Sequence, residues 1–545
     1  MGKGSRNREN RIVDGLESEN VGVKLSKMQL IKQQKKKEKT KKIITSVIAV
    51  VILIGIIVGV VAMNQSRTPK LVGVISATSQ AYELDNAMMA YFLYSQYNTF
   101  VNNNYYYLSY YGLNPNLSLK QQNFSTNMTW FSYFMRAAKL QVKELVAMAT
   151  EAQNQGVALD EEELKEIDDY LAELKADSQI KSTYGSLKNY LSAIYAPGVT
   201  EDTVRKCIRL QELAAKYYEQ LIESFEYTDE EMNKYVEDNP ESFYKFDYIY
   251  YDFDPETKTG ATADEKKAAL EAAKKAAEEF LAKVTDEASF KNLIVELEKK
   301  AEEEAETTGT TTTGTSTGTG SDTEKTDEDY LKNFIKESQA YKADSDFGKW
   351  AFENDRKDGD FKLIENTKKS TVDGKEVTEV TGYTVYFLTK AKYVDDYATK
   401  DVRHILFTKT KYGTDDAAKK KAEEVLAEFN KGEKTAEAFG ELAKKYTEDS
   451  NGDKGGLYEN VTKGYMVTEF NDWMYDEERQ VGDTEIIKTK YGYHIMYHEG
   501  DGEIAWKLSA KDGLKAEEYE SYLKELQEKE THAVTFNDKL LAVIP

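Results

Sequence analysis

Cysteine and proline are scarce in this sequence, which has one cysteine and six prolines among 545 residues. The single Cys207 excludes a disulfide framework and a cysteine-based zinc site. It also excludes a lipid anchor on an N-terminal cysteine, because Cys207 lies far from any signal-like segment. The 73 Lys and Arg residues are outnumbered by 96 Asp and Glu residues, which gives a net charge of -23. This excess argues against nucleic acid as the main partner, since phosphate binding needs clustered basic residues.

The charge is distributed unevenly around a long apolar run. Residues 1–42 hold 13 Lys or Arg and 5 Asp or Glu, a net of +8, so the rest of the chain carries -31. The 21 residues from Ile43 to Met63 have no charge, and at ~1.5 Å per residue they can cross a ~30 Å hydrocarbon core. The positive-inside rule then places residues 1–42 in the cytoplasm and 64–545 outside. We predict a single-pass protein of the cell membrane.

A cleaved signal peptide is the alternative for this run. Val60-Val61-Ala62 has the small side chains of a cleavage site. However, both the basic region and the apolar run are long for a signal peptide. A buried core helix fits less well, because the run is apolar on every face.

Residues 71–243 are predicted to be mostly helical and are rich in aromatic side chains. Tyr91, Tyr94 and Tyr97 are three residues apart and can share a helix face. Two interpretations remain open: an aromatic hydrophobic core, or an apolar cradle for unfolded polypeptide. Further on, the capping box that starts at Thr228 predicts a new helix that stops before Pro240.

An internal repeat organises the next part of the chain. The segment DFGKWAFENDRKDGDFKLI at 346–364 matches EFNDWMYDEERQVGDTEII at 469–487, with a constant offset of 123. Upstream, the predicted strand FDYIYY is placed like VRHILF at 402–407, and each precedes a helix of Ala, Lys and Glu, at 263–281 in the first case. We therefore predict two homologous α/β units, copy one at 244–395 and copy two at 398–500.

Copy one differs from copy two by two insertions. The segment 307–323 has ten Thr and four Gly among 17 residues and is predicted to be flexible. Its glycines Gly318 and Gly320 follow no strand and precede no Gly-Lys-Ser/Thr, so a phosphate-binding loop is rejected. Downstream, Gly382-Tyr383-Thr384 matches Gly492-Tyr493-His494 with an offset of 110. The shorter offset indicates a hairpin-like insertion around Asp373-Gly374 in copy one.

The groups that carry chemistry lie in copy two. It holds His404 near its first strand, His494 in its last strand, and a glycine-rich loop that begins at Asp449. Copy one has Tyr248 and Thr384 at the two histidine positions, so it cannot perform the same chemistry.

Two metal sites are rejected, and two histidines are assigned to the surface. His494 and His498 are four residues apart in a predicted strand, a span of ~13 Å that is too long for one zinc ion. The loop at Asp449 has Lys454 and Asn460 where a calcium loop needs Gly and Glu. His498 and His532 are predicted to be surface residues.

Five ordered blocks of copy two resemble the parvulin-type peptidyl-prolyl isomerases. They are VRHILF, a Lys/Glu-rich helix, FGELAKKYTEDSNGDKGG, GYMVTEF and KTKYGYHIM. The flanking segments YGSLKNYLSAIYAPGV and YTDEEMNKYVEDNPESF, and the helix after Gly513, are similar to the helical module of the PrsA/SurA-type extracytoplasmic foldases. In that family, segments on both sides of the isomerase unit form this module, and it binds unfolded chains.

The resemblance implies a role for each matching residue. His404 and His494 match the family's paired histidines, and Asp449 matches the residue that faces the substrate amide. Thr489 and Tyr491 match the polar positions beside the second histidine. The proline pocket matches Tyr458, Met466 and Phe470. Three positions depart from the family pattern: Tyr458 replaces a Leu, Val461 a Phe and Thr468 a Pro.

Structural interpretations stay open beside these functional ones. The two histidines can serve to orient the pocket through a mutual hydrogen bond, or can contact the reacting amide. Asp449 can be a solvated loop carboxylate, and Met466 and Phe470 can be plain core. Isomerisation of an X-Pro bond needs no nucleophile, metal or cofactor, so none is expected. The twisted amide has a less polar carbonyl and a more basic nitrogen, which an apolar pocket with a few hydrogen bonds can favour.

The sequence thus predicts an α+β protein of six parts. They are a basic tail at 1–42, a transmembrane helix at 43–63, a helical chaperone module at 71–243, a degenerate parvulin-like copy one, an active copy two, and a C-terminal helical segment at 501–545. The function expected from the resemblance is that of a membrane-anchored foldase for unfolded secreted polypeptides with X-Pro bonds. The alternatives are a holdase chaperone without turnover and a structural envelope protein. A homodimer through the helical module is left open.

Overall fold

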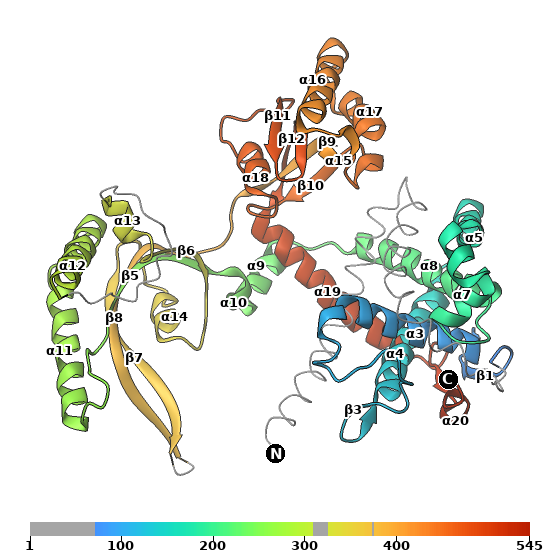
Figure 1. Ribbon diagram of the computed structural model, residues 1–545, viewed down its shortest axis with the longest axis horizontal. Helices are drawn as coiled ribbons and strands as arrows, with labels where there is room; N and C mark the ends of the chain where they lie inside the picture. Colours follow the sequence, from blue (N-terminus) through green and yellow to red (C-terminus); the bar gives the residue numbers. More distant parts are fainter. Residues whose placement is uncertain (1–70, 309–324, 373–374) are drawn as a thin grey trace. The chain divides into compact units, whose positions relative to one another are not determined.

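The computed structural model describes residues 71–308, 325–372 and 375–545 (Figure 1). The predicted basic tail, the predicted transmembrane helix at 43–63 and most of the Thr/Gly-rich segment lie outside these residues. Within the described ranges, no helix is long and apolar enough to span a membrane. Backbone contacts divide the chain into two compact units, one of residues up to 227 with 399–502 and 511–545, the other of 228–398 with 503–510.

The helical module is built around helices α3 (Asn86–Asn103), α4 (Trp130–Asn154) and α8 (Glu201–Ser224). The side chains of Asp85, Thr129 and Thr200 cap the starts of these three helices, because each accepts a hydrogen bond from a backbone N–H of the first turn. Their apolar faces share one core with the end of α19 (Ala505–Glu528). The remaining elements are β1 (Ile75–Thr78), β2 (Glu83–Asp85), the 3-10 helix η2 (Tyr105–Tyr107), β3 (Asn123–Ser125), β4 (Met128–Thr129), α5 (Glu161–Ala176), α6 (Ser178–Tyr184), α7 (Leu187–Ile194), β13 (Thr535–Phe536) and α20 (Asp538–Leu541).

Helix α19 is longer than expected, because it begins at Ala505 and runs through Gly513. A glycine inside a helix costs about 1 kcal/mol relative to alanine. Tyr519, Leu523 and Leu526 of this helix are buried in the core of the module. Burial of such side chains contributes ~1.5–3 kcal/mol each, which outweighs the glycine.

The two ends of the described chain meet in this module. Strand β13 pairs antiparallel with β1, with Ala77 opposite Phe536. The side-chain amide of Asn86 donates to the carbonyl of Leu540 at 2.8 Å, and the hydroxyl of Tyr94 donates to the carbonyl of Pro545 at 2.7 Å. The last ten residues are therefore part of the helical module.

The prediction that His532 is a surface residue is wrong. Its side chain is 2% exposed, and its Nε2 lies 3.0 Å from Oε2 of the buried Glu151. The other ring nitrogen lies 2.8 Å from the hydroxyl of Thr531. The imidazole is buried because it joins the C-terminal segment to α4 through a carboxylate that is 381 residues away in the sequence.

Most of the aromatic side chains between residues 81 and 135 form the core of the module. Tyr91 is 8% exposed, and its ring packs edge-on against Phe92 at 5.3 Å. Tyr97 packs in the same way against Phe134 at 5.6 Å. Edge-on aromatic pairs are the favoured geometry in protein interiors. Along α3 the structure thus agrees with the aromatic-core interpretation.

Copy one and copy two have four-stranded antiparallel sheets with the same strand order, β6-β5-β8-β7 and β10-β9-β12-β11. Helices α9 (Asp229–Asp238) and α10 (Pro240–Phe243) precede copy one and belong to the same compact unit. Copy one itself contains β5 (Lys245–Phe253), α11 (Ala263–Leu281), α12 (Glu287–Thr308), α13 (Asp327–Leu331), β6 (Ile335–Ala340), α14 (Asp346–Ala351), β7 (Phe361–Val372) and β8 (Lys375–Tyr393). Copy two contains β9 (Ala398–Phe407), α15 (Lys409–Tyr412), α16 (Asp415–Lys431), α17 (Ala436–Tyr446), the 3-10 helix η3 (Gly452–Lys454), β10 (Leu457–Val461), α18 (Thr468–Met474), β11 (Thr484–Thr489) and β12 (Gly492–Ile504).

The register of the last two strands is the same in both copies. Ile364 pairs with Thr384 in copy one, and Ile487 pairs with His494 in copy two. The preceding turns match as well, since Gly359 has φ 90° and Gly482 has φ 91°. Both glycines hold the left-handed conformation that favours glycine. The predicted repeat is therefore present in three dimensions.

The hairpin insertion lies between β7 and β8. In copy two, the ladder closes at the pair of Thr489 and Gly492. In copy one, the equivalent pair is Asn366 and Gly382, but the ladder continues to the pair of Val372 and Lys375. The turn residues 373–374 themselves lie outside the described part of the chain.

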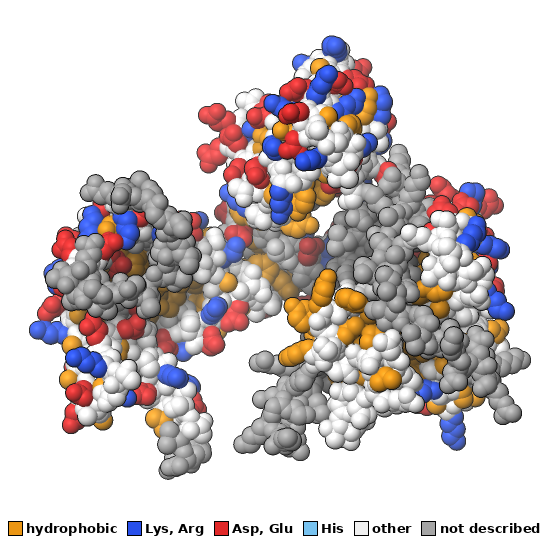
Figure 2. Space-filling view, in the orientation of Figure 1, with side chains coloured by type: hydrophobic (Ala, Val, Ile, Leu, Met, Phe, Trp, Pro, Cys, Tyr) orange, Lys and Arg blue, Asp and Glu red, His pale blue; other side chains and the backbone are white. Residues whose placement is uncertain are grey.

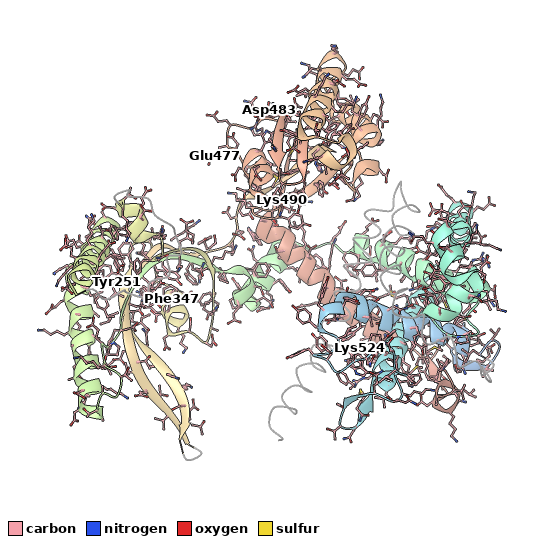
Figure 3. All side chains as sticks on the ribbon, viewed as in Figure 1. Tyr251, Phe347, Glu477, Asp483, Lys490 and Lys524 are labelled. Carbon is pink, nitrogen blue, oxygen red and sulfur yellow. The ribbon has the colours of Figure 1, made fainter. Side chains whose placement is uncertain are left out.

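Each sheet separates two hydrophobic clusters. One face packs on the long helices, α11 and α12 in copy one or α16 and α17 in copy two. The other face packs on the short helix α14 or α18. Figure 3 shows Tyr251 on the side of the long helices and Phe347 on the side of α14. The two predicted histidine positions lie on strands β9 and β12 of copy two.

The prediction that His498 is a surface residue is also wrong, because its side chain is 3% exposed. Its backbone donates to the carbonyl of Asp483 and accepts from Gly482. In copy one, Leu388 makes the equivalent backbone bonds with Asp360 and Gly359. His498 thus occupies an interior strand position that holds a leucine in copy one.

Candidate functional site

Two histidines from neighbouring strands stack inside copy two. His404 lies on β9 and His494 on β12, and their side chains are 3% and 4% exposed. The ring centroids are 5.2 Å apart at an interplanar angle of 22°. The two Nδ1 atoms are 3.0 Å apart, so one of them donates a hydrogen bond to the other. The two histidines meet because β9 and β12 are neighbouring strands of the sheet.

The loop after α17 brings a carboxylate to the same place. The hydroxyl oxygen of Thr447 accepts from the backbone N–H of Leu406 at 2.9 Å and of Asp449 at 3.2 Å. The backbone N–H of Asn451 donates to Oδ1 of Asp449 at 3.0 Å. Short turns of this kind are typical of Asp and Asn. They fix the Asp449 side chain relative to strand β9.

Glycines let the loop pack closely on β9. The backbone N–H of His404 donates to the carbonyl of Gly456 at 3.0 Å. A Cβ on Gly456 would lie 2.2 Å from the His404 carbonyl oxygen, and its φ of +72° is also unfavourable for other residues. Arg403 holds the loop from the other side, because its guanidinium donates to the Lys454 carbonyl at 3.0 Å and pairs with Glu499 at 2.6 Å.

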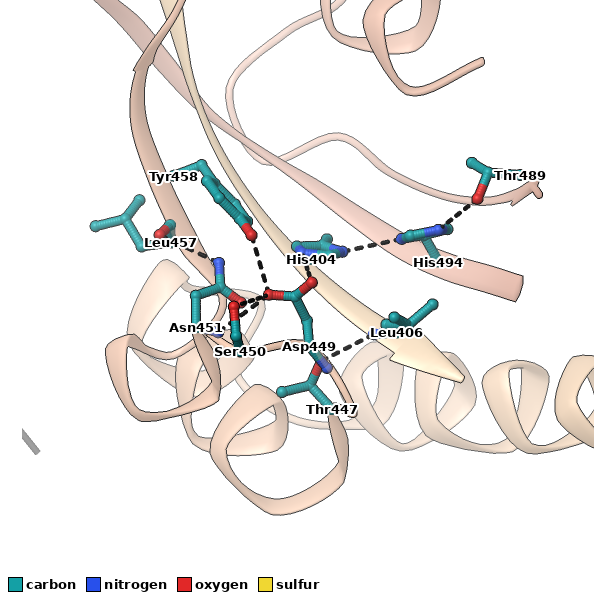
Figure 4. A network of polar contacts seen from close by, with 10 residues as sticks. All are labelled: His404, Leu406, Thr447, Asp449, Ser450, Asn451, Leu457, Tyr458, Thr489 and His494. Carbon is teal, nitrogen blue, oxygen red and sulfur yellow. Dashed lines mark hydrogen bonds and ion pairs between the residues drawn. The ribbon is translucent and has the colours of Figure 1, made fainter. Parts of the chain in front are cut away.

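A line of polar side chains results, which Figure 4 shows from Tyr458 to Thr489. The hydroxyl of Tyr458 donates to Oδ1 of Asp449 at 3.0 Å. Oδ2 of Asp449 lies 3.7 Å from Nε2 of His404, which is longer than a hydrogen bond. At the other end, Nε2 of His494 lies 2.8 Å from the hydroxyl oxygen of Thr489. Five of the eight predicted site residues are therefore joined in one row.

The row has an uneven charge distribution. Burial raises the pKa of Asp449. The nearby His404, the Asn451 N–H and the Tyr458 hydroxyl lower it by more, so the pKa of Asp449 lies well below the usual range of a carboxyl group. Burial and the neighbouring His404 lower the pKa of His494 to about 3. At neutral pH, Asp449 is thus a carboxylate and His494 is a neutral imidazole.

This charge pattern restricts the positions of the protons. The Asp449 carboxylate favours a proton on Nε2 of His404, which makes no hydrogen bond within the described chain. With a neutral His404, His494 donates through Nδ1 and accepts from the Thr489 hydroxyl.

An apolar wall stands beside the row. Phe470 of α18 is 3% exposed, and its ring lies edge-on to His404 at 5.3 Å and to His494 at 5.9 Å. Met466 is half-buried and packs on the same cluster, which also contains Val461. Thr468, where the resembling family has Pro, is the first residue of α18, a position at which proline is common in helices.

Tyr491 does not join the row through its side chain. The ring is 58% exposed at the hairpin between β11 and β12. Only its backbone N–H takes part, as a donor to the Thr489 hydroxyl at 3.1 Å. Tyr491 therefore supports Thr489 by its position in the turn.

Exposure separates the residues of the site into two sets. The side chain of Asp449 is 21% exposed, and Tyr458 and Met466 are also half-buried. The two histidines and Phe470 lie deeper. A ligand at the surface of copy two meets Asp449, Tyr458 and Met466 before it meets the histidines.

The equivalent place in copy one is filled with aromatic rings. Phe347, at the position of Phe470, stacks on Tyr386 at 4.4 Å and lies 4.4 Å from Tyr248. Thr384, at the position of His494, is buried and donates to Asp252 at 2.5 Å. Copy one keeps the fold, and in its described residues Thr384 is bonded to Asp252 and Asn366 in place of the histidine pair.

Sequence reasoning did not single out several residues that hold the site together. Thr447 and Asn451 shape the Asp449 loop, and Arg403 fixes its glycines. The pattern Thr-x-Asp-x-Asn in this segment is a signal for such turns. No local signal pointed to the pair of Arg403 and Glu499, because its members are 96 residues apart.

Comparison with known families assigns this domain. Residues 383–498 match the family model of the PPIC-type PPIase domain, and these residues contain the histidine pair, the Asp449 loop and the apolar wall. The chain therefore carries a PPIC-type peptidyl-prolyl isomerase domain at these residues, and the parvulin-type resemblance drawn from the five sequence blocks of copy two is confirmed.

Individual relatives are similar over limited regions. The chain is 32% identical to the chaperone SurA of Hahella chejuensis over 130 residues, which are 23% of this chain and 29% of that protein. The structure of the peptidylprolyl isomerase PrsA from Bacillus anthracis covers 25% of this chain and 59% of its own, at 23% identity and a TM-score of 0.17. The structure of PrsA from Bacillus cereus covers 64% of this chain and 93% of its own, at 16% identity and a TM-score of 0.17.

Proposed function

We propose that this chain is a membrane-anchored, extracytoplasmic peptidyl-prolyl cis-trans isomerase that assists the folding of secreted proteins. The observation that carries the proposal is the buried row from Asp449 to Thr489 beside the wall of Phe470 and Met466. The family match of residues 383–498 supports the same reaction. The clients would be unfolded or partly folded polypeptides with X-Pro bonds.

The reaction needs preferential binding of a twisted amide. An X-Pro bond crosses a barrier of ~18–20 kcal/mol and takes tens to hundreds of seconds without help. A ten-thousandfold acceleration needs about 5.4 kcal/mol of preference for the transition state. Twisting removes amide resonance, so the carbonyl oxygen loses negative charge and the nitrogen becomes more basic.

Asp449 is placed to exploit this change. A planar amide carries partial negative charge on its oxygen, and a nearby carboxylate disfavours that state relative to the twisted one. The low pKa of Asp449 keeps the carboxylate charged at neutral pH. Because the site is partly buried, the interaction is stronger than it would be in water. We assign Asp449 to this role and the two histidines to the positioning of its neighbours.

The apolar wall would bind the proline ring. Phe470 and Met466 offer a surface that excludes water, and Tyr458 borders it on strand β10. Burial of a proline ring there would orient the bond before Asp449. The apolar wall thus recognises the proline ring, and the Asp449 carboxylate favours the twisted state of the amide.

The apolar run and the charge asymmetry support the membrane anchor and the outside location. Residues 43–63 are uncharged and follow a segment of net charge +8. The positive-inside rule then places the isomerase domain on the extracytoplasmic side. This is where newly secreted chains fold.

The test measures isomerisation of peptides with several X-Pro sequences by the full chain, with NMR exchange spectroscopy as the readout. Wild type is compared with Asp449→Asn, which removes the charge and keeps the shape. The matched control is Glu459→Gln, an exposed carboxylate on strand β10 next to Tyr458. We expect a large loss of rate for Asp449→Asn and none for Glu459→Gln. A wild-type chain without exchange activity on any peptide would refute the enzymatic proposal.

A second candidate function is that of a holdase chaperone, which binds unfolded chains without useful turnover. It is favoured by copy one, which keeps its sheet and fills the site with Phe347, Tyr248 and Tyr386. A copy without catalytic groups that retains its fold is consistent with selection for binding. Suppression of aggregation in the absence of exchange activity would support this candidate.

A further inference from the structure

The segment from Asn86 to Lys143 lacks carboxylates altogether. These 58 residues contain no Asp or Glu, although the whole chain has 96 among 545 residues. They contain four basic residues, Lys120, Arg136, Lys139 and Lys143. At the average frequency, about ten carboxylates would be expected here. This stretch of sequence thus carries a charge of +4 in a protein of net charge -23, with Lys139 paired to Asp538 of helix α20 in the fold.

The same segment exposes a cluster of tyrosines. Tyr105, Tyr106, Tyr107 and Tyr110 are 44%, 89%, 63% and 68% exposed. In the orientation of Figure 2, hydrophobic and uncharged side chains gather on the surface over α3 and α4. We call these four residues the tyrosine cluster. Exposed tyrosine rings on an uncharged surface indicate contact with something that is part apolar and part polar.

The tyrosine cluster is presented by an ordered stretch of chain. Leu108, Leu113 and Leu119 are buried in the core of the module and hold the stretch down. The backbone N–H of Tyr107 donates to Asn104, and that of Tyr111 donates to Tyr107. The rings are exposed because the leucines between and after them take the inward positions.

The basic residues lie close to this stretch. The backbone N–H of Phe131, in the first turn of α4, donates to the carbonyl of Leu119 at 3.0 Å. Arg136 and Lys143 are exposed further along the same helix, with Leu140 between them at 54% exposure. Lys120 follows Leu119 directly and places its ammonium over the ring of Phe131. Lys120 thus lies on the stretch that follows the tyrosine cluster, and Arg136 and Lys143 lie further along helix α4.

We propose that the tyrosine cluster docks on the surface of an anionic lipid bilayer, with its rings at the level of the headgroups. Tyrosine is enriched at membrane interfaces, because its ring is apolar and its hydroxyl polar. Basic side chains near such a surface are attracted to anionic lipids. The absence of carboxylates removes the repulsion that an acidic protein otherwise meets there.

The length of the tether favours the bilayer as the occupant, and this step rests on the proposed membrane anchor. Only residues 64–70 separate the apolar run from Leu71, which is 2% exposed in the core of the module. Seven extended residues span at most ~25 Å. The module is therefore held near the bilayer, and Leu71 belongs to the same hydrophobic core as Leu108.

An unfolded polypeptide is the competing occupant and fits less well. Tyr106 and Tyr110 are 89% and 68% exposed, whereas a groove for an extended chain would half-bury them. Unfolded clients carry charges of both signs, so they give no reason for the lack of carboxylates. An anionic surface accounts for both features.

The experiment uses the full chain with one reporter on the tyrosine cluster. Cys207 is the only cysteine of the chain and is fully buried, so the exposed Tyr106→Cys can be labelled alone with an environment-sensitive fluorophore. The matched control is Tyr465→Cys, at a tyrosine of copy two that is 70% exposed. Unchanged melting temperatures confirm that both variants fold. Each protein is placed in phosphatidylcholine vesicles with and without phosphatidylglycerol.

We expect the label at position 106 to become brighter and blue-shifted with phosphatidylglycerol, and to be quenched by headgroup spin-labelled lipid. The label at position 465 should not respond. Arg136→Gln combined with Lys143→Gln should reduce the quenching at position 106, as should 1 M salt, where the Debye length falls to ~3 Å. An unresponsive label at position 106 would overturn the inference. So would a label that responds to added unfolded protein and not to lipid, which would make the cluster a client site.

The anchor is scored separately, by flotation of the same chain with vesicles after alkaline carbonate treatment. A chain that floats without a lipid response at position 106 refutes the docking and leaves the anchor standing. A chain that does not float refutes the anchor. The label is then measured with vesicles added from outside, where the same response supports docking and its absence overturns it.

Discussion

Phe347 and Phe470 occupy the same position in the two copies but meet different partners. The ring of Phe470 lies edge-on to His404 and His494. The ring of Phe347 stacks on Tyr386 and contacts Tyr248. The two phenylalanines therefore form a natural pair of test and control for any experiment on the isomerase site.

Truncation of the apolar wall should reduce isomerisation. Met466→Ala or Phe470→Ala removes ~1.5–3 kcal/mol of burial, which corresponds to as much as about a hundredfold in rate if all of it acts in the transition state. The rate is measured by NMR exchange on an X-Pro peptide with the full chain. Phe347→Ala is the matched control and should leave the rate unchanged. A rate that falls equally in the control would mean that copy one contributes to turnover.

His404→Gln should lower the melting temperature of the protein clearly and the rate of isomerisation only slightly. The imidazole is buried, and its partner His494 would lose a hydrogen bond in the interior. A buried polar group without a partner costs ~1–3 kcal/mol. Thermal unfolding followed by circular dichroism measures the first effect, and peptide exchange measures the second. An inactive variant with unchanged melting temperature would place the imidazole in direct contact with the amide.

Stability should fall with acid through His494. Its folded-state pKa is lowered from 6.5 to about 3 by burial and by His404. Below pH 6.5 the unfolded chain binds a proton that the folded chain refuses, so unfolding becomes easier as the pH falls from 6.5 towards 3. His494→Gln removes this contribution. Its melting temperature should be lower at neutral pH and should change less with pH over this window. Parallel curves for the two proteins would contradict the assignment of a neutral, buried imidazole.

The repeat was predictable because its two copies carry matching local patterns, whereas the pairing of His404 and His494, which are 90 residues apart, was predictable only from the resemblance of the sequence blocks to a known family. The Phe347 and Trp350 pattern recurs at Phe470 and Trp473, and the turns at Gly359 and Gly482 need glycine for their positive φ. The burial of His532 was not predictable, because its partner Glu151 is 381 residues away. His498 looked polar by residue type, yet the strand register places it inside. Contacts between distant residues were therefore predicted only where a known family supplied them, and burial that depends on strand register was missed.

The orientation of the chain can be tested on intact cells. Protease added from outside should digest the part after residue 64 and spare residues 1–42, since the charge is +8 before the apolar run and -31 in the rest of the chain. Antibodies against each part report the result on a blot, and permeabilised cells serve as the control. Digestion of the tail alone would reverse the orientation.

Chaperone activity should survive the loss of isomerisation. Binding by apolar burial is non-directional and does not require a proline. Asp449→Ala in the full chain should therefore still suppress aggregation of an unfolded test protein, followed by light scattering. If suppression disappeared together with the exchange activity, the client site would lie in copy two, and the helical module would serve only as a stalk.

The pairing of β1 with β13 determines when the molecule can finish folding. Ala77 of β1 and its partner Phe536 of β13 are 459 residues apart (536 − 77), and at about 5–20 residues per second their synthesis is separated by roughly 23–92 s. Both α/β copies are complete before β13 leaves the ribosome, so each can fold while the helical module still lacks its last strand and helix. Under the proposed function, the newly made chain would thus itself be an incompletely folded polypeptide outside the membrane for about its first minute.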